Sequence, residues 1–260
     1  MDSKTIIALT AVILASGCAS SSSNGTGVKV EKFSISDSTL TPGQQAQIEA
    51  EIVNYHRSPS EVKSEWVSLF NTGQIEVMEK SCTPGSIGKA DDGFNPKMMC
   101  TWTVQAPRES YVKGFSSKPV SVKLRMKYSA SLENRKPLKI SFKPVNDIEQ
   151  SSTVKKTVTN GDVEVNVKTE NPVALNNPQT VTVTARNIGP GNLVEDYSIE
   201  FDPSNVVENC NSPEVIQEEL SKTCELNAGT EGVRNMFIST SYKYEKSPNL
   251  DIEVVNPDAR

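Results

Sequence analysis

Apolar and polar residues alternate along many short segments of this chain, and Gly, Pro and Asn lie between the segments. In one such segment Val120, Val122 and Leu124 alternate with Ser121 and Lys123. Alternation with a period of two predicts antiparallel strands that bury one face. About seven such strands in roughly 100 residues is typical of an immunoglobulin-like sandwich. We therefore predict an all-β fold.

The pattern occurs twice in the chain. Residues 47–54 and 180–187 both alternate, both follow a proline turn, and both end on Asn. A strand that contains aromatic residues follows in each copy, and two cysteines come after it. This internal repeat predicts two tandem immunoglobulin-like β-sandwich domains, which we place at 28–146 and 160–258 with a linker at 147–159.

Each copy is expected to close with a hairpin, because two alternating segments stand on either side of a short polar segment. The predicted hairpins pair 120–128 with 138–142, and 238–244 with 250–254.

The N-terminus carries an export signal. Residues 5–15 are apolar, but a helix that spans a membrane needs about 20 residues. The run fits a signal peptide, and its end, from Leu14 to Cys18, resembles the lipobox of exported lipoproteins. We predict a signal peptide at 1–17 and a lipid on Cys18 that holds the protein at the extracellular face of the membrane. Ordinary secretory cleavage is the alternative.

Residues 18–27 are rich in Ser and Gly and are expected to form a flexible linker. The linker contains an N-glycosylation sequon at Asn24, which predicts a glycan if the host modifies such sites. An unmodified linker is the alternative.

After Cys18 is set aside, four cysteines remain, and an even number behind an export signal predicts two disulfides. Three pairings are possible. The repeat favours Cys82 with Cys100 and Cys210 with Cys224, because each copy then holds its own bridge. The cysteine spacing and the presence of one histidine, His56, argue against a metal site, and no cofactor is predicted. We expect His56 to be an exposed loop residue.

The segment between Cys82 and Cys100 is long and contains Phe94, Met98 and Met99. If these side chains are exposed, the loop is a candidate recognition tip. A polar turn without a binding role is the alternative.

Charge is unevenly distributed along the chain. Residues 28–146 hold 17 Lys and Arg against 12 Asp and Glu, whereas residues 147–260 hold 9 against 19, so the net charges are +5 and −10. Five cations are expected on the outer face of the first hairpin: Lys123, Arg125, Lys127, Lys139 and Lys143.

A basic face of this kind has two interpretations. It can be a solvated surface whose lysines prevent aggregation. It can also contact anionic headgroups, another surface protein or the acidic half of a neighbouring copy. Nucleic acid is disfavoured as a partner, because the whole chain is acidic and the basic face lacks interleaved aromatic residues.

Residues 180–201 carry an alternating strand, then Asn187-Ile188-Gly189, and then a strand that ends on Phe201. This arrangement resembles the CARDB-type immunoglobulin-like modules of archaeal and bacterial cell surfaces. The resemblance implies a β-sandwich and display at the cell surface, and it supplies no catalytic residue.

From these features we expect a membrane-anchored cell-surface lipoprotein that is not an enzyme and has a structural or protein-interaction role. The alternative is a ligand-binding accessory subunit of a transporter or of a glycan-processing complex, which would need a pocket between the domains.

Overall fold

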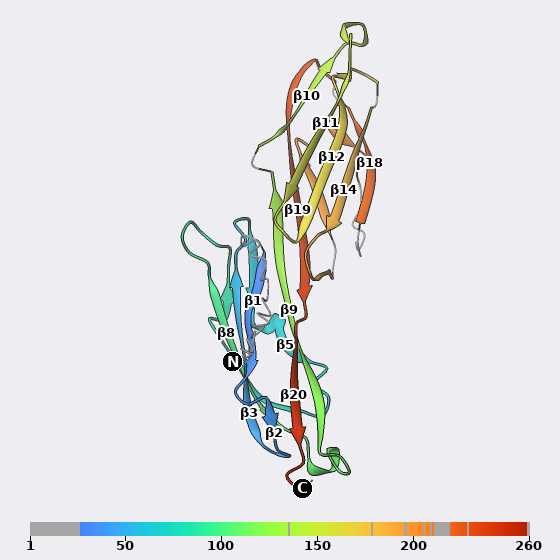
Figure 1. The fold of residues 1–260 in the computed structure, drawn as a ribbon. Coiled ribbons are helices and arrows are strands. Elements are labelled where there is room, and N and C mark those ends of the chain that lie inside the picture. Colours follow the sequence, from blue (N-terminus) through green and yellow to red (C-terminus); the bar gives the residue numbers. More distant parts are fainter. Residues whose placement is uncertain are drawn as a thin grey trace, which may run out of the picture.

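The computed structural model describes residues 27–134, 136–177, 179–194, 197–204, 206–208, 210, 219–227 and 229–258. The fold is all-β, as predicted, with several antiparallel sheets consistent with β-sandwich packing. The described part forms an elongated molecule with a lower and an upper lobe (Figure 1). Its helices are short 3-10 turns: η1 (Ser64–Trp66), η2 (Glu109–Tyr111) and η3 (Val145–Asp147).

The lower lobe contains a sheet with the strand order β1-β3-β8-β6, and the upper lobe contains a sheet with the order β11-β12-β14-β18-β17. Apolar side chains alternate inward along β3, so its Ile48, Ala50 and Ile52 are all fully buried. The lower strands are β1 (Val28–Ile35), β3 (Gln45–Asn54), β6 (Glu76–Thr83) and β8 (Lys97–Gln105). The upper strands are β11 (Ser152–Thr159), β12 (Val163–Asn171), β14 (Gln179–Asn187), β17 (Val207–Glu208) and β18 (Glu219–Leu226).

A third sheet runs through both lobes (Figure 1). Two long segments form its centre, residues 117–143 and 232–255, and we call them together the spine. The first segment contains β9 (Ser117–Glu133) and β10 (Leu138–Lys143), and the second contains β19 (Gly232–Lys246) and β20 (Asn249–Val255). Shorter strands extend the sheet at its edges: β2 (Thr39–Leu40), β4 (Ser60–Lys63), β5 (Val67–Phe70), β7 (Ser86–Ile87), β13 (Val173–Ala174), β15 (Asn192–Leu193) and β16 (Ser198–Asp202).

The two segments of the spine are antiparallel and keep one register along β9. Ser117 pairs with Val255, Met126 with Lys246 and Glu133 with Ser239, so β19 and β20 follow one another along the same edge of β9. The short break between β19 and β20 does not interrupt this order, because Leu124 N donates to Pro248 O over 3.0 Å.

The break between β9 and β10 is closed in a similar way by Asn134, which is 6% exposed. Its backbone N–H donates to Ile238 O over 3.1 Å, and its Oδ1 accepts from Ile238 N over 2.7 Å. Strand β10 then continues along β19, with Leu138 opposite Met236.

The predicted closing hairpins are therefore wrong. Strand β9 pairs with β19 and β20 instead of β10, and β20 pairs with β9 instead of β19. The polar segments from which turns were expected are short interruptions in two nearly straight chains. Each half of the sequence thus gives its last strand to the lobe of the other half.

This exchange bears on the predicted domain boundaries. Strand β20 belongs to the second half of the sequence, yet it lies in the lower lobe, between β9 and the parallel strand β2. Strand β10 belongs to the first half and lies in the upper lobe (Figure 1). The division into domains at 28–146 and 160–258 stays a prediction, because one sheet joins strands from both ranges.

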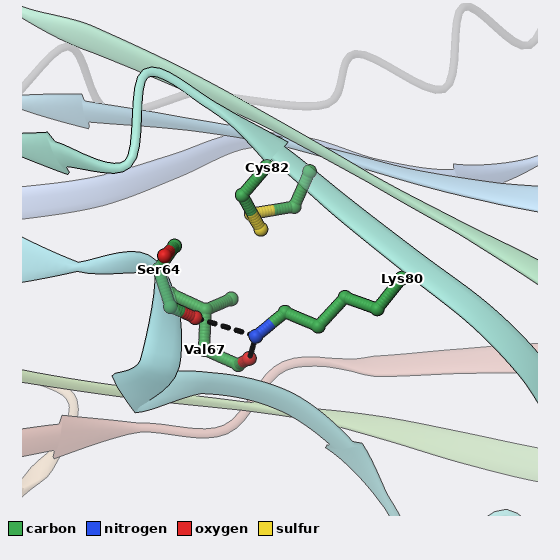
Figure 2. Close-up of a disulfide and its surroundings, with 5 residues drawn as sticks. Ser64, Val67, Lys80 and Cys82 are labelled. Atoms are coloured by element: carbon green, nitrogen blue, oxygen red, sulfur yellow. Dashed lines mark hydrogen bonds between the residues drawn. A yellow bond between two sulfur atoms is a disulfide. The ribbon is translucent and has the colours of Figure 1, made fainter.

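Both predicted disulfides are present. One links two neighbouring strands of a sheet, and the other links a strand to the residue that follows the neighbouring strand. Cys82 of β6 lies opposite Cys100 of β8, and Cys210, just after β17, is bonded to Cys224 of β18. Figure 2 shows the Cys82 bridge beside Lys80, whose ammonium reaches across to the carbonyl oxygens of Ser64 and Val67. Burial lowers the pKa of Lys80. The bridge therefore joins β6 to β8 within its own sheet, and Lys80 joins β6 to the opposite layer of the lower lobe.

Asn134→Ala tests the continuity of the spine. The substitution removes the acceptor of the buried Ile238 N–H, and an unsatisfied buried donor costs about 1–3 kcal/mol. We expect the free energy of unfolding, measured in urea, to fall by that amount. Asn146→Ala at an exposed position is the matched control and should change it by less than about 0.5 kcal/mol. An equal effect of both substitutions would contradict this role of Asn134.

Candidate functional site

A buried cluster of ionisable side chains lies where the two lobes meet on the spine. We call this region the waist. The carboxylate of Asp162 is buried there, with 1% of the side chain exposed. Asp162 belongs to the turn between β11 and β12, and Asn160 Oδ1 accepts from the backbone N–H groups of Asp162 and Val163. This Asx-type turn directs the carboxylate toward the lower lobe.

Three donors surround Asp162. His56 Nε2 lies 3.0 Å from Oδ2, and the Tyr128 hydroxyl donates to the same oxygen over 2.5 Å. Lys246 Nζ lies 3.1 Å from Oδ1. His56 comes from the loop after β3, and Tyr128 and Lys246 come from the two segments of the spine. The carboxylate therefore holds together parts of the chain that are far apart in the sequence. We call these four residues the waist cluster.

The expected exposure of His56 is wrong, because the residue is only 2% exposed. Asn54 holds its loop, since Asn54 Oδ1 accepts from His56 N over 3.0 Å and Asn54 Nδ2 donates to Gly88 O over 2.7 Å. A carboxylate only accepts hydrogen bonds, so the proton lies on Nε2 of His56. Among the described residues, Nδ1 has no hydrogen-bond partner.

The protonation states of the cluster follow from burial and charge. Burial raises the pKa of Asp162, but the His56 hydrogen bond, the Lys246 charge and the Tyr128 hydrogen bond outweigh it, and the net pKa lies below the usual 3.8. Burial and the Asp162 charge raise the pKa of Tyr128 well above 10, which keeps its hydroxyl a donor. Burial lowers the pKa of Lys246, and Asp162 opposes this change.

The chain enters the described structure at this same place. Lys246 Nζ donates to Val28 O over 2.6 Å, and Tyr55 N donates to Gly27 O over 2.9 Å. Gly27 has φ +87°, and a Cβ on it would stand 2.9 Å from Asp162 Oδ1. Gly27 and Val28, the first residues that the structure describes, therefore lie at the waist and not at one of the ends of the molecule.

The segment that carries the CARDB resemblance also packs at the waist. The Tyr244 hydroxyl donates to Asn187 Oδ1 over 2.8 Å and accepts from Gly191 N over 3.0 Å. Gly189 N donates to Asp162 O, and a Cβ on Gly189 would lie 2.5 Å from the Tyr244 hydroxyl. Burial raises the pKa of Tyr244 to about 12. The small residues of this segment allow its backbone to approach the spine closely.

Two clefts flank the waist cluster. One has a volume of about 570 Å³ and is lined by 28–30, 161–162, 188–190 and 246–248. The other has a volume of about 480 Å³ and is lined by 55–58, 132–133 and 157–160. Asp162 and Lys246 border the first cleft, and His56 borders the second.

The five predicted cations do not share one hairpin. Lys123, Arg125 and Lys127 lie on β9, whereas Lys139 and Lys143 lie on β10 in the upper lobe. Glu245 lies across the spine, 3.5 Å from Arg125 Nε and 4.0 Å from Lys127 Nζ. Arg125 also stacks 4.3 Å from the ring centre of Phe70. Part of the predicted basic face is thus neutralised within the protein.

The predicted recognition tip is only partly exposed. Phe94 is 64% and Met99 40% exposed, but Met98 is fully buried, because it faces the core from β8. Cys18 and Asn24 lie outside the described residues, as do 1–17 and the rest of the predicted linker up to Thr26. No helix in the described ranges has the length and apolar character to cross a membrane.

No family model matches the chain, and no curated protein matches it. The CARDB resemblance therefore stays a prediction that rests on residues 180–201. In the part of the chain that the structure describes, no group of three or more His, Cys, Asp or Glu side chains is placed to hold a metal ion.

Asp162→Asn tests the waist cluster. All three neighbours donate to the two carboxylate oxygens of Asp162. The amide of Asn keeps only one acceptor oxygen, and its NH₂ group would face at least one of the donors without forming a hydrogen bond. The change also leaves the buried Lys246 ammonium without its counter-charge, which costs about 3–5 kcal/mol. We expect a loss of this size in the free energy of unfolding in urea. Asp251→Asn at an exposed position of β20 should have little effect, and equal losses would contradict the role of Asp162.

The pH dependence of stability gives a second test. The pKa of Asp162 is below its usual value of 3.8 in the folded protein. The ionised carboxylate therefore contributes fully to the free energy of unfolding above pH 3.8, and this contribution is lost as the pH falls through the pKa of the folded protein. Urea unfolding of the wild type should therefore show a fall in stability in this acid range. The fall should be shallower in Asp162→Asn. Parallel curves would show that Asp162 does not contribute.

Proposed function

We propose that this protein is a lipid-anchored, non-catalytic arm of the extracellular cell surface, with a structural or interaction role. The observation that carries the proposal is the spine. Two long segments run through both lobes in antiparallel pairing, and the waist cluster binds both lobes to them. Such a body resists bending, because bending at the waist would break buried hydrogen bonds and an ion pair. Stiffness is what a spacer or scaffold requires.

The disulfides and the export signal support the extracellular location. Two bridges are typical of proteins that fold in an oxidising compartment. The lipobox-like sequence that ends at Cys18 supplies the anchor, and the nine residues after it supply the reach. In this proposal the outer surfaces of the lobes meet another surface protein or further copies of the chain.

Cys18→Ser tests the anchor in a cell that exports and lipidates the protein. We expect the wild-type chain to incorporate labelled fatty acid and to sediment with membranes. The variant should lose the label and appear in the soluble fraction. A wild-type chain that is soluble and unlabelled would contradict the proposal. Ser16→Ala is the control, because it leaves the cysteine in place.

A ligand-binding accessory role is the second candidate, and the cleft of about 570 Å³ at the waist favours it. Ile188 lines this cleft and is 49% exposed, so a large side chain there should fill part of the space. If a screened small molecule raises the melting temperature of the wild type, Ile188→Trp should reduce that rise. A rise that is unchanged in Ile188→Trp would place the ligand elsewhere.

A further inference from the structure

The free end of the lower lobe carries a firmly held loop with an exposed aromatic ring. The loop, residues 106–116 between β8 and β9, includes η2 and turns at Gly114, which has φ +81°. Val112 is fully buried and anchors it, and Val112 O accepts from Phe115 N over 2.9 Å. Phe115 nevertheless remains 55% exposed. In Figure 1 this loop lies at the lower extremity of the molecule, close to the C-terminus.

One cation lies over the exposed ring. Lys118 Nζ lies 4.1 Å from the ring centre of Phe115 and 5.2 Å from that of Tyr111. Arg108 and Lys113, both exposed, belong to the same loop. Three carboxylates lie in or beside the loop. Glu109 is part of it, Glu253 pairs with Pro119, and Asp258 follows Asn256, whose N–H donates to Ser116 O. The exposed ring, and not a positive field, therefore distinguishes this tip.

Trp and Tyr are the aromatic residues enriched at the membrane–water interface, and Phe occurs on the apolar face of helices that lie in it. The ring is apolar enough to enter the headgroup region, and lysine extends its charge back toward lipid phosphates. We call Arg108, Lys113, Phe115 and Lys118 the lower tip.

The length of the chain before Gly27 distinguishes the two ends of the molecule. From Cys18 to Gly27 is nine residues, which reach at most about 30 Å. Met126 marks the waist on the spine, because it pairs with Lys246. Ser117, near the lower tip, is nine strand residues from Met126, and this corresponds to a distance of about 30 Å. Lys143 at the upper end is seventeen residues away from Met126, or about 56 Å. A lipid on Cys18 at the end of an extended linker therefore brings the membrane to the level of the lower tip, whereas the upper end lies beyond the reach of the linker.

We propose that the lower tip is a second membrane contact, which binds phospholipid headgroups and holds the body upright with the upper lobe outward. This inference rests on the proposed lipid anchor at Cys18. Phe115 enters the headgroup region, and Arg108, Lys113 and Lys118 bind lipid phosphates. The lipid on Cys18 and the tip then restrain the body at two points.

Fluorescence of a polarity-sensitive NBD label tests the contact. The full chain with Phe115→Cys is purified with its disulfides intact, labelled, and reconstituted through its lipid into vesicles of phosphatidylglycerol and phosphatidylcholine. We expect the emission at position 115 to shift to the blue and to be quenched by nitroxide lipids. Val233→Cys in the upper lobe is the matched control, because its native side chain is 60% exposed, and its label should behave as in water.

The outcomes separate this proposal from the anchor. No shift at position 115 in a chain that stays on the vesicles through Cys18 would overturn the tip contact and leave the anchor intact. Equal shifts at 115 and 233 would overturn the upright orientation. If the chain carries no lipid, the anchor fails, and the label at 115 is then measured in the Cys18→Ser chain on the same vesicles. A shift there supports the tip contact alone, and its absence overturns it.

A second variant keeps the test independent of the label. Phe115→Ser in the Cys18→Ser chain should lower partitioning into these vesicles by about tenfold, as expected for the loss of one inserted aromatic ring. Phe94→Ser removes a similarly exposed ring close to the waist and should leave partitioning unchanged. Equal partitioning of the two variants would contradict the proposal.

Discussion

The buried carboxylate of Asp162 determines how the two lobes join. A carboxylate with 1% of its side chain exposed is unfavourable unless donors surround it, and its donors come from the lower lobe and from both segments of the spine. The upper-lobe turn that holds Asp162 can therefore be buried only when the other parts are in place. This requirement makes the joint between the lobes specific.

The exchange of β10 and β20 has the same consequence. In a tandem pair of closed sandwiches a linker alone would connect the domains, and domains with small contacts usually move relative to one another. Here two antiparallel segments cross the waist, and the pairs from Met126 to Glu133 join them there. Relative motion of the lobes would strain backbone hydrogen bonds of the spine. The chain entry at Gly27 is attached to this same stiff region, so the proposed anchor holds the molecule near its middle.

The sequence predicted the strands, the all-β fold and both disulfides, because these depend on local alternation and on the repeat. It did not predict the exchange, because a strand alternates in the same way whichever neighbour it pairs with. The polar residues around Asn134 and Pro248 suit a hairpin turn and a short interruption equally well. The choice depends on contacts over more than 100 residues, such as Asn134 with Ile238. His56 gave no signal of burial, since its partner Asp162 lies 106 residues away. The repeat did contain a usable signal, because Asn54 and Asn187, the two residues that end its strands, both hold loops at the waist.

If the spine and the waist cluster make the two lobes one stiff body, the distance between a position in each lobe should be nearly fixed. Double electron–electron resonance would measure the distance between spin labels at two exposed positions, Ser121→Cys in the lower lobe and Phe237→Cys in the upper lobe, in a chain with Cys18→Ser. We expect one narrow distance distribution, which broadens when Asp162→Asn is added. A broad distribution in the chain with intact Asp162 would show that the lobes move independently and that the molecule is not one stiff body.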